Sequence, residues 1–401
     1  MTTSRRFLMV LLGAGIGIFA GCGGGTSASK TPPGSSVSGQ NVQAISVNGG
    51  PTGNYANGLF TSVTVCVPGT AQCQTISDVL VDTGSSGLRI LSSALSETLP
   101  QQTGQTGNAV VECLPFMAAV TWGPVQTADI QIAGESASSV PIQVLSDTAF
   151  AEAAGCKAKG LPSQDTLQTL GANGILGVGV FTQDCGVSCT LTGSSNPGLY
   201  YECTSSSCQV TTESVSVQVQ NPVALFAADN NGVLIELPAV SSPQPSVSGS
   251  LIFGIGTRSN NALGNATVYT MTSSAEITTS FKGQSYPGSF LDSGSNGLFF
   301  LDSGTTGMPV CTDNKGFYCP SSTQNLSATI TGTNNASATV SFSVASADSL
   351  FSNAGDFAFS DLGGPSPGIF DWGLPFFFGR NVFTAIEGAS TPNGTGPYWA
   401  F

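Results

Sequence analysis

The hydrophobic and polar positions along the chain follow the period of β-strands far more often than that of helices. From residue 44 onward, short runs of β-branched and aromatic residues are bounded by Gly, Pro, Asn and Ser, which favour turns. The predicted strands include 59–67, 128–132, 214–219, 250–254 and 338–344. Helical periodicity is scarce, and only short helices are expected, over 163–171 and near 222–228. The pattern therefore predicts an all-β fold.

The first residues differ from the rest of the chain. Arg5 and Arg6 precede an apolar, glycine-containing run over 7–19, and the letters FAGC end at Cys22. Such an order is typical of an export signal. The ending resembles a bacterial lipobox, which implies a signal peptide over 1–21 and acylation of Cys22, although Phe19 stands where an aliphatic residue is usual. An unlipidated signal peptide is the alternative, whereas a membrane span would need an apolar run of roughly 20 residues.

The segment 22–43 is rich in Gly, Ser, Thr and Pro, which predicts a flexible tether between a lipid anchor and the folded body. Gly rather than Asp follows Cys22, and by analogy with sorted lipoproteins this favours the outer membrane of a bacterial cell envelope. The rest of the chain exceeds one comfortable hydrophobic core. We therefore expect two β lobes, over 44–222 and 223–401.

Composition narrows the chemistry that the chain can perform. It contains no His, which excludes Ser/His/Asp and Cys/His nucleophile pairs and imidazole metal ligands. Its 23 acidic and 10 basic residues give a net charge of −13, which repels phosphate backbones and argues against a nucleic-acid partner. We expect a monomer whose chemistry runs on carboxylates or hydroxyls, with no metal and no cofactor.

The cysteine count adds information about the compartment. Of the 11 Cys, Cys22 is assigned to lipid, and the others suit five disulfides in an oxidising compartment. Close spacing predicts four pairs and leaves Cys113 and Cys156 for each other; the four are Cys66–Cys73, Cys185–Cys189, Cys203–Cys208 and Cys311–Cys319. A structural zinc site is the competing interpretation, and the absence of a C-x-x-C pair argues against it.

An internal repeat is the most specific feature of the sequence. The segment VDTGSSGLRIL (81–91) aligns without gaps to LDSGSNGLFFL (291–301), 210 residues later. Each copy is an apolar strand that runs into Asp, a hydroxyl residue and Gly, and then into a second apolar strand. Two simple Asx turns are the structural alternative. A third Asp-Ser-Gly begins at Asp302, but its partner in the repeat is Ser92, so we predict a surface turn there.

The repeat and its surroundings resemble the pepsin-like aspartic proteases over most of 54–388. The similarity also rests on NGILGVG (173–179), SGSLIFG (248–254) and GLPFFFGRNVFTAI (373–386), which follow in the family's order. The resemblance implies a bilobal fold in which each lobe contributes one Asp, and hydrolysis of an extended peptide or protein substrate at acidic pH. Asp82 and Asp292 would act jointly as general base and general acid around one water.

The residues that flank each Asp have roles that chemistry suggests. Gly84 and Gly294 allow tight turns, and Thr83 and Ser293 can hydrogen-bond the opposite loop. The remaining pair, Ser85 and Ser295, can donate to the outer carboxylate oxygens.

Some positions depart from the family pattern. The hairpin that covers substrate in active members normally carries a Tyr, whereas the stretch VECLPFMAAVTWGP (111–124) has none; Phe116 or Trp122 could fill that space. Arg89 also replaces the usual Trp, and Gly87 the usual Asn. These departures, with a Cys-rich insertion over 185–208, keep open a catalytically inactive binding protein at the cell surface. A purely structural lipoprotein is a third alternative.

Overall fold

The computed structural model describes residues 40–401 except residue 147, and it consists almost entirely of strands. The all-β prediction is therefore confirmed. The α-helices of the described chain are single turns: α1 (Ala154–Lys157), α2 (Leu167–Leu170), α3 (Ser303–Thr306) and α4 (Ala347–Leu350). Within residues 40–401, we find no helix with the length and apolar character to cross a membrane. Short 3-10 turns are η1 (Ser92–Ala94), η2 (Gly186–Thr190), η3 (Gly193–Ser195), η4 (Pro222–Leu225) and η5 (Leu374–Phe376).

One long sheet runs through both halves of the chain. Its strands, in spatial order, are β10 (Cys208–Val210), β9 (Tyr200–Cys203), β5 (Ala109–Pro115), β6 (Val120–Ile132), β7 (Glu135–Leu145), β4 (Ser86–Leu91), β8 (Gly174–Val178), β3 (Cys73–Asp82), β2 (Gly58–Cys66), β1 (Val42–Asn48), β12 (Val247–Phe253), β11 (Gly232–Leu237), β21 (Arg380–Ala385), β24 (Tyr398–Ala400) and β13 (Val268–Thr270). The halves meet at β1, which pairs antiparallel with β2 on one side and with β12 on the other.

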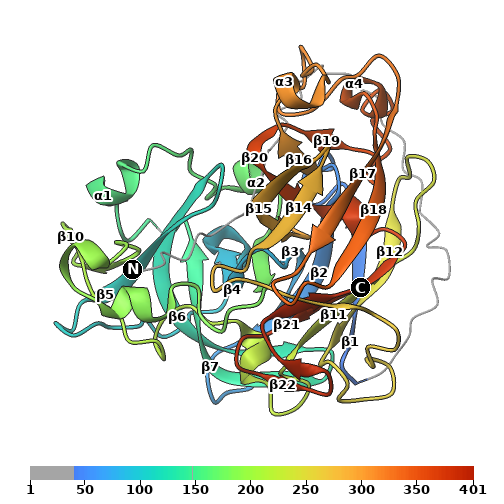
Figure 1. The fold of residues 1–401 in the computed structure, drawn as a ribbon. Coiled ribbons are helices and arrows are strands. Elements are labelled where there is room, and N and C mark those ends of the chain that lie inside the picture. The colour runs from blue at the N-terminus through green and yellow to red at the C-terminus, as the bar shows by residue number, and fades with distance from the viewer. Residues whose placement is uncertain (1–39, 147) are drawn as a thin grey trace, which may run out of the picture.

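A second sheet belongs to the C-terminal half alone. Its order is β18 (Ser337–Val344), β17 (Gln324–Thr331), β14 (Ile277–Phe281), β15 (Gln284–Leu291), β20 (Ser366–Trp372), β16 (Leu298–Leu301) and β19 (Gly363–Gly364). A separate ribbon pairs β22 (Ser390–Thr391) with β23 (Gly394–Thr395). In Figure 1 the second sheet, in orange and red, stands apart from β5, β6 and β7, in teal and green.

The internal repeat of the sequence is also a repeat of topology. In the first lobe, β8 lies between β3 and β4, parallel to β3 and antiparallel to β4. In the second lobe, β20 lies in the same way between β15 and β16. The two Asp loops therefore connect equivalent strands, which a pair of unrelated Asx turns would not explain.

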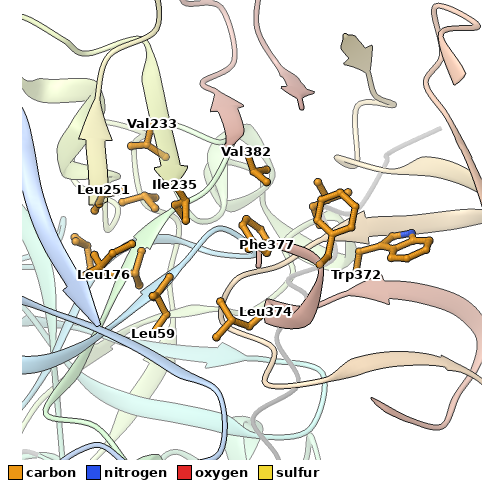
Figure 2. Packing of buried hydrophobic residues seen from close by; sticks show 14 of the residues in the cluster. Leu59, Leu176, Val233, Ile235, Leu251, Trp372, Leu374, Phe377 and Val382 are labelled. Atoms are coloured by element: carbon orange, nitrogen blue, oxygen red, sulfur yellow. The ribbon is translucent and has the colours of Figure 1, made fainter. Parts of the chain in front are cut away.

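A continuous apolar core joins the two lobes. Figure 2 shows Leu59 and Leu176 of the first lobe close to Leu251, and the same cluster continues through Leu374 to Trp372. Towards the second sheet the core becomes aromatic, with Phe300, Phe370 and Trp372 stacked in sequence at centroid distances of 5.0 and 5.5 Å. Such aromatic burial supplies a large share of the apolar area that stabilises a lobe.

Most predicted elements are found, with shifted ends. The predicted strand 214–219 is wrong: its polar–apolar alternation suits a strand, but residues 215–217 form a turn. There the Val219 N–H donates to the Tyr200 hydroxyl rather than to a neighbouring strand. The predicted tether ends early, because β1 begins at Val42. Residues 1–39, with the predicted signal peptide, Cys22 and most of the tether, lie outside the described residues, and the lobe boundary at 222/223 stays a prediction.

The predicted disulfides all form. The pairs are Cys66–Cys73, Cys113–Cys156, Cys185–Cys189, Cys203–Cys208 and Cys311–Cys319. Five disulfides are consistent with an oxidising compartment. The pairs differ greatly in the length of chain that they close, and Cys113–Cys156, which anchors β5, spans 43 residues.

We expect the loss of Cys113–Cys156 to destabilise the protein more than the loss of a local disulfide. Closing 43 residues restricts the unfolded chain by about 4 kcal/mol, whereas closing the 5 residues of Cys203–Cys208 restricts it by about 2 kcal/mol. Urea unfolding of Cys113→Ala/Cys156→Ala, with Cys203→Ala/Cys208→Ala as the matched control, measures this. Equal losses in the two double variants would contradict the expectation.

Candidate active site

Each Asp of the repeat stands where a central strand ends. The last residue of β3 is Asp82, opposite Gly177 of β8, and Asp292 directly follows β15. In each lobe the strand that leads into the Asp runs parallel to its neighbour, β3 to β8 and β15 to β20. Each Asp loop therefore lies at the end of the sheet where the neighbouring strand also ends. The second Asp loop packs tightly against the residue that follows β20. A Cβ at Gly373 would lie 2.1 Å from the carbonyl oxygen of Gly297, so only glycine fits there.

Reciprocal hydrogen bonds fasten the two loops together. The Thr83 N–H donates to the Ser293 hydroxyl (3.1 Å), and the Ser293 N–H donates to the Thr83 hydroxyl (2.9 Å). The Ser293 hydroxyl in turn donates to the carbonyl of Val81 (2.9 Å). These residues are 210 positions apart in the chain and buried, so the bonds are not exchanged with water. Thr83 and Ser293 thus each hydrogen-bond the opposite loop.

The two carboxyl groups have matched donors. Oδ1 of Asp82 accepts from the Gly84 N–H (2.8 Å), and its Oδ2 accepts from the Ser85 hydroxyl. Asp292 repeats the pattern with the Gly294 N–H (2.7 Å) on Oδ1 and the Ser295 hydroxyl (2.9 Å) on Oδ2. A Cβ at Gly294 would lie 2.6 Å from Oδ1 of Asp82, which shows how closely the second loop approaches the first carboxyl. We call Asp82 and Asp292 the dyad.

The two carboxyl groups of the dyad share a hydrogen bond, and both Asp side chains are fully buried. Burial raises the pKa of Asp82, while hydrogen bonds from Asp292, Ser85 and Gly84 and the charge of Arg89 act against the rise. Burial also raises the pKa of Asp292, and the charges of Asp82 and Asp371 raise it further. Two adjacent carboxylates cannot both ionise at low cost. Burial and the closeness of the two groups therefore favour a state in which the pair holds one proton.

A third carboxyl, that of Asp371 on β20, belongs to this site and was not predicted. It is 1% exposed, and its Oδ2 lies 2.6 Å from the Ser295 hydroxyl. Burial raises its pKa well above the ordinary value, and the charge of Asp82 adds to the rise. A signal in the sequence could have identified it: Asp371 is an acid inside the otherwise apolar and aromatic run IFDW, directly before the segment 373–386.

Tyr55 was also not predicted as a site residue. It lies on the segment between β1 and β2, its ring packed edge-on against Phe60 at 5.5 Å. Burial of its hydroxyl, and then the charges of Asp82 and Asp292, raise the pKa of Tyr55. The same segment reaches the second lobe, because the Asn57 side-chain amide donates to the carbonyl of Asn296 (2.8 Å). A phenol from the first lobe is thus held near the dyad.

Arg89 forms a buried charge cluster behind the first loop. Its guanidinium donates to Glu112 (3.2 Å) and Asp184 (3.0 Å), and all three side chains are fully buried. It also donates to the carbonyl of Ser86 (3.0 Å), next to the donor Ser85. The family's usual Trp is therefore replaced by a cation that links the first Asp loop to β5, and its charge favours the ionised form of Asp82.

Phe116 and Trp122 are packed inside the first lobe. Phe116 is 2% exposed and lies under the Arg89 guanidinium, 5.9 Å from it. Trp122 is 5% exposed, contacts Tyr201 edge-on and donates its indole N–H to the carbonyl of Phe150 (3.0 Å). Side chains that are buried in this way are committed to the lobe's own core. The sequence could not distinguish this position from a covering one.

Two other candidates lie outside the site. Asp302 caps α3, where its Oδ1 accepts from the Thr305 N–H (2.8 Å), in line with the predicted surface turn. Among residues 40–401, one group has metal-like spacing, Cys311, Cys319 and Asp348. Its two sulfurs are joined in a disulfide, so they offer no thiolate ligands.

We expect Asp292→Asn to stabilise the protein at alkaline pH. A carboxyl whose pKa is raised by folding contributes stability that is full at acidic pH and is lost as the pH rises through its folded pKa. The amide removes that loss, so the melting temperature of the variant should exceed that of wild type by a few degrees at about pH 8 and match it near about pH 4.

Asp302→Asn makes the same change within the same tripeptide but outside the dyad, and it is the matched control. A melting-temperature difference for Asp292→Asn that does not vary with pH would contradict the assigned burial of the dyad.

Comparisons with known proteins agree with this architecture. The crystal structure of an aspartic proteinase from Irpex lacteus is similar with a TM-score of 0.52 and 15% identity, and the match covers 90% of this chain and 96% of that one. At this identity the likeness shows the fold alone: the bilobal, all-β fold of pepsin-like aspartic proteinases. No curated protein sequence matches the chain. The family described as "Protein of unknown function (DUF3443)" matches residues 37–401, and the chain belongs to this family.

Proposed function

We propose that the protein is an aspartic endopeptidase, which hydrolyses peptide bonds at acidic pH through Asp82 and Asp292. One observation carries the proposal: two buried carboxyls, from equivalent loops of the two lobes, share a hydrogen bond and have matched backbone and hydroxyl donors. This geometry supports one retained proton and one negative charge side by side, which is what activation of water by a carboxylate pair requires.

We assign the proton to Asp292, because the charge of Arg89 favours the ionised form of Asp82, and the reaction follows from this assignment. A water between the carboxyls gives a proton to Asp82 as its oxygen attacks the peptide carbonyl carbon, and Asp292 gives its proton to the carbonyl oxygen. The resulting diol collapses as the C–N bond breaks: Asp82 protonates the leaving nitrogen, and a diol hydroxyl returns a proton to Asp292. Water is thereby divided between the new acid and the new amine, and the dyad returns to its starting state.

The substrate class is an extended segment of peptide. Strand-like main-chain hydrogen bonds would hold such a segment, with apolar pockets on either side for alternate side chains. Activity should decline as the pH rises and the pair loses its last proton, because the carbonyl oxygen then has no acid.

We expect the wild-type folded body to cleave an unfolded protein at about pH 3–5, and Asp82→Asn and Asp292→Asn to lower the rate by ~10²–10⁴-fold, because each removes one partner in proton transfer. Peptide products are measured by mass spectrometry. The matched control, Asp302→Asn, alters a carboxyl that caps α3 and should cleave at the wild-type rate. Equal rates in wild type and the dyad variants would refute the proposal.

A second candidate is a binding protein that keeps the dyad without hydrolysis. The burial of Phe116 and Trp122 favours it, because neither side chain is free to cover a bound chain. A peptide that mimics the tetrahedral intermediate separates the two: its binding should raise the melting temperature at low pH if the dyad accepts the reacting group. No rise, together with no cleavage, supports the binding protein.

We also propose that the protein is anchored in the cell envelope through a lipid on Cys22. In the described part of the chain every other cysteine is in a disulfide, which suits an exported protein. The basic and apolar order of 1–21 and the small residues before Cys22 support processing there. Gly23 supports placement in the outer membrane.

Cys22→Ser should move the protein from the membrane fraction to the soluble envelope fraction. The wild-type protein should carry the mass of a diacylglycerol on its new N-terminus, measured by mass spectrometry of the intact chain, and the variant should not. Processing that is insensitive to an inhibitor of lipoprotein signal peptidase would contradict lipidation.

A further inference from the structure

Asp371 breaks the symmetry between the two lobes. In the first lobe, Arg89 of β4 pairs with Ile175 of β8. In the second lobe, the corresponding Phe299 of β16 pairs with Asp371 of β20. The position that holds an apolar side chain behind the first loop therefore holds a carboxyl behind the second, and that carboxyl needs an explanation beyond the repeat.

The contacts of Ser295 limit the protonation state of this carboxyl. The Ser295 Oγ lies 2.9 Å from Oδ2 of Asp292 and 2.6 Å from Oδ2 of Asp371. A hydroxyl has one proton, so it can donate to only one of two carboxyls. The other contact is a hydrogen bond only if that carboxyl is protonated and donates to Oγ. In the first lobe the equivalent Ser85 faces Asp82, and Ile175 offers no competing acceptor.

The surroundings of Asp371 offer no positive charge to an ionised form. Its other oxygen, Oδ1, is buried and has no donor among the described residues. The negative charge of Asp82 acts on Asp371 and on its neighbour Asp292, and Asp371 acts on Asp292. The positive charge of Arg89, in the first lobe, acts on Asp82. The adjacent strands β15 and β16 contain no Asp, Glu, Lys or Arg, and their titratable side chain is Tyr286, which packs on Phe370.

We propose that Asp371 is a positioning residue for the dyad: as a neutral acid it donates its proton to the Ser295 hydroxyl, which frees the hydroxyl proton for Oδ2 of Asp292. Asp82, Asp292 and Asp371 then form one unit of three carboxyls. This inference rests on the proposed function for its effect on catalysis, but the proton arrangement itself does not.

The unit has two balanced proton arrangements. In the first, Asp371 is protonated and donates to Ser295, which donates to Asp292. In the second, both protons have moved one step: Asp292 is protonated at Oδ2 and donates to Ser295, which donates to an ionised Asp371. Loss of the Asp371 proton therefore removes the donor from the outer oxygen of Asp292 and adds a second negative charge beside it. The active form needs Asp371 neutral.

The protonation of Asp371 is tested by infrared difference spectroscopy of the full chain. We expect the wild-type minus Asp371→Asn spectrum at neutral pH to contain the C=O stretching band of one carboxylic acid. Asp302→Asn is the matched control for an acid-to-amide change at a surface cap. Loss of carboxylate bands instead of the acid band in Asp371→Asn would overturn the proposal, whether or not the protein cleaves peptides.

The coupling to the dyad is tested by the pH profile of cleavage. In Asp371→Asn and in Asp371→Ile, which restores the first-lobe residue, the alkaline limb should move to higher pH while the KM stays within about twofold of wild type. At the pH where the wild-type kcat has fallen to about half, both variants should remain near their maximum. Profiles that superimpose on wild type would overturn the coupling. If no form cleaves peptides, the proposed function fails, and infrared titration of the Asp292 acid band tests the coupling instead. That titration must move to lower pH in both variants, because they lack the charge of Asp371 that favours the protonated form of Asp292.

Discussion

The hydrogen bonds that Thr83 and Ser293 exchange are the constraint on which the site depends. Each N–H donates to the hydroxyl of the opposite residue, so neither loop can move without breaking a bond in the other. Because both residues are buried, water does not replace a broken bond, and the loss costs more than at a surface. Rigid loops in turn fix the distance between the carboxyls, and it is this distance that forces the pair to share one proton.

The two lobes surround the members of the pair with different groups. Behind the first loop lies Arg89, whose charge favours the ionised form of Asp82. Behind the second loop lies the buried carboxyl of Asp371, which as a neutral acid gives Asp292 no such positive charge. The backbone is close to symmetric, but the charges are not. A symmetric scaffold therefore carries a polarised pair, in which one side is suited to accept a proton and the other to donate one.

Much of the architecture and of the site could be predicted from the sequence alone. The gapless repeat placed Asp82 and Asp292 in equivalent loops because each loop is a local motif. Close spacing likewise predicted four disulfides and left Cys113 and Cys156 for the fifth. Asp371 was not predicted because its partner Ser295 lies 76 residues earlier, and only the pairing of β16 with β20 brings them together. For Phe116 and Trp122, the position in the hairpin could be predicted from the sequence. The direction of their side chains could not, because it depends on contacts with Arg89, Tyr201 and the rest of the core. The strand predicted over 214–219 does not form: residues 215–217 turn, and the Val219 N–H donates to a buried tyrosine hydroxyl instead of a neighbouring strand.

The pairing of β1 with β12 has a consequence for how the molecule can be assembled. Val42–Asn48 lies next to Val247–Phe253, so the first strand of the fold is completed by one made some two hundred residues later. A chain that emerges from a ribosome or a translocation pore with its N-terminus first must leave one edge of β1 open until most of its length has appeared. Native structure of such long range forms slowly, and an open edge can pair with another chain. During synthesis, before β12 has appeared, this edge of β1 is thus open to pairing with another chain, which the finished fold prevents.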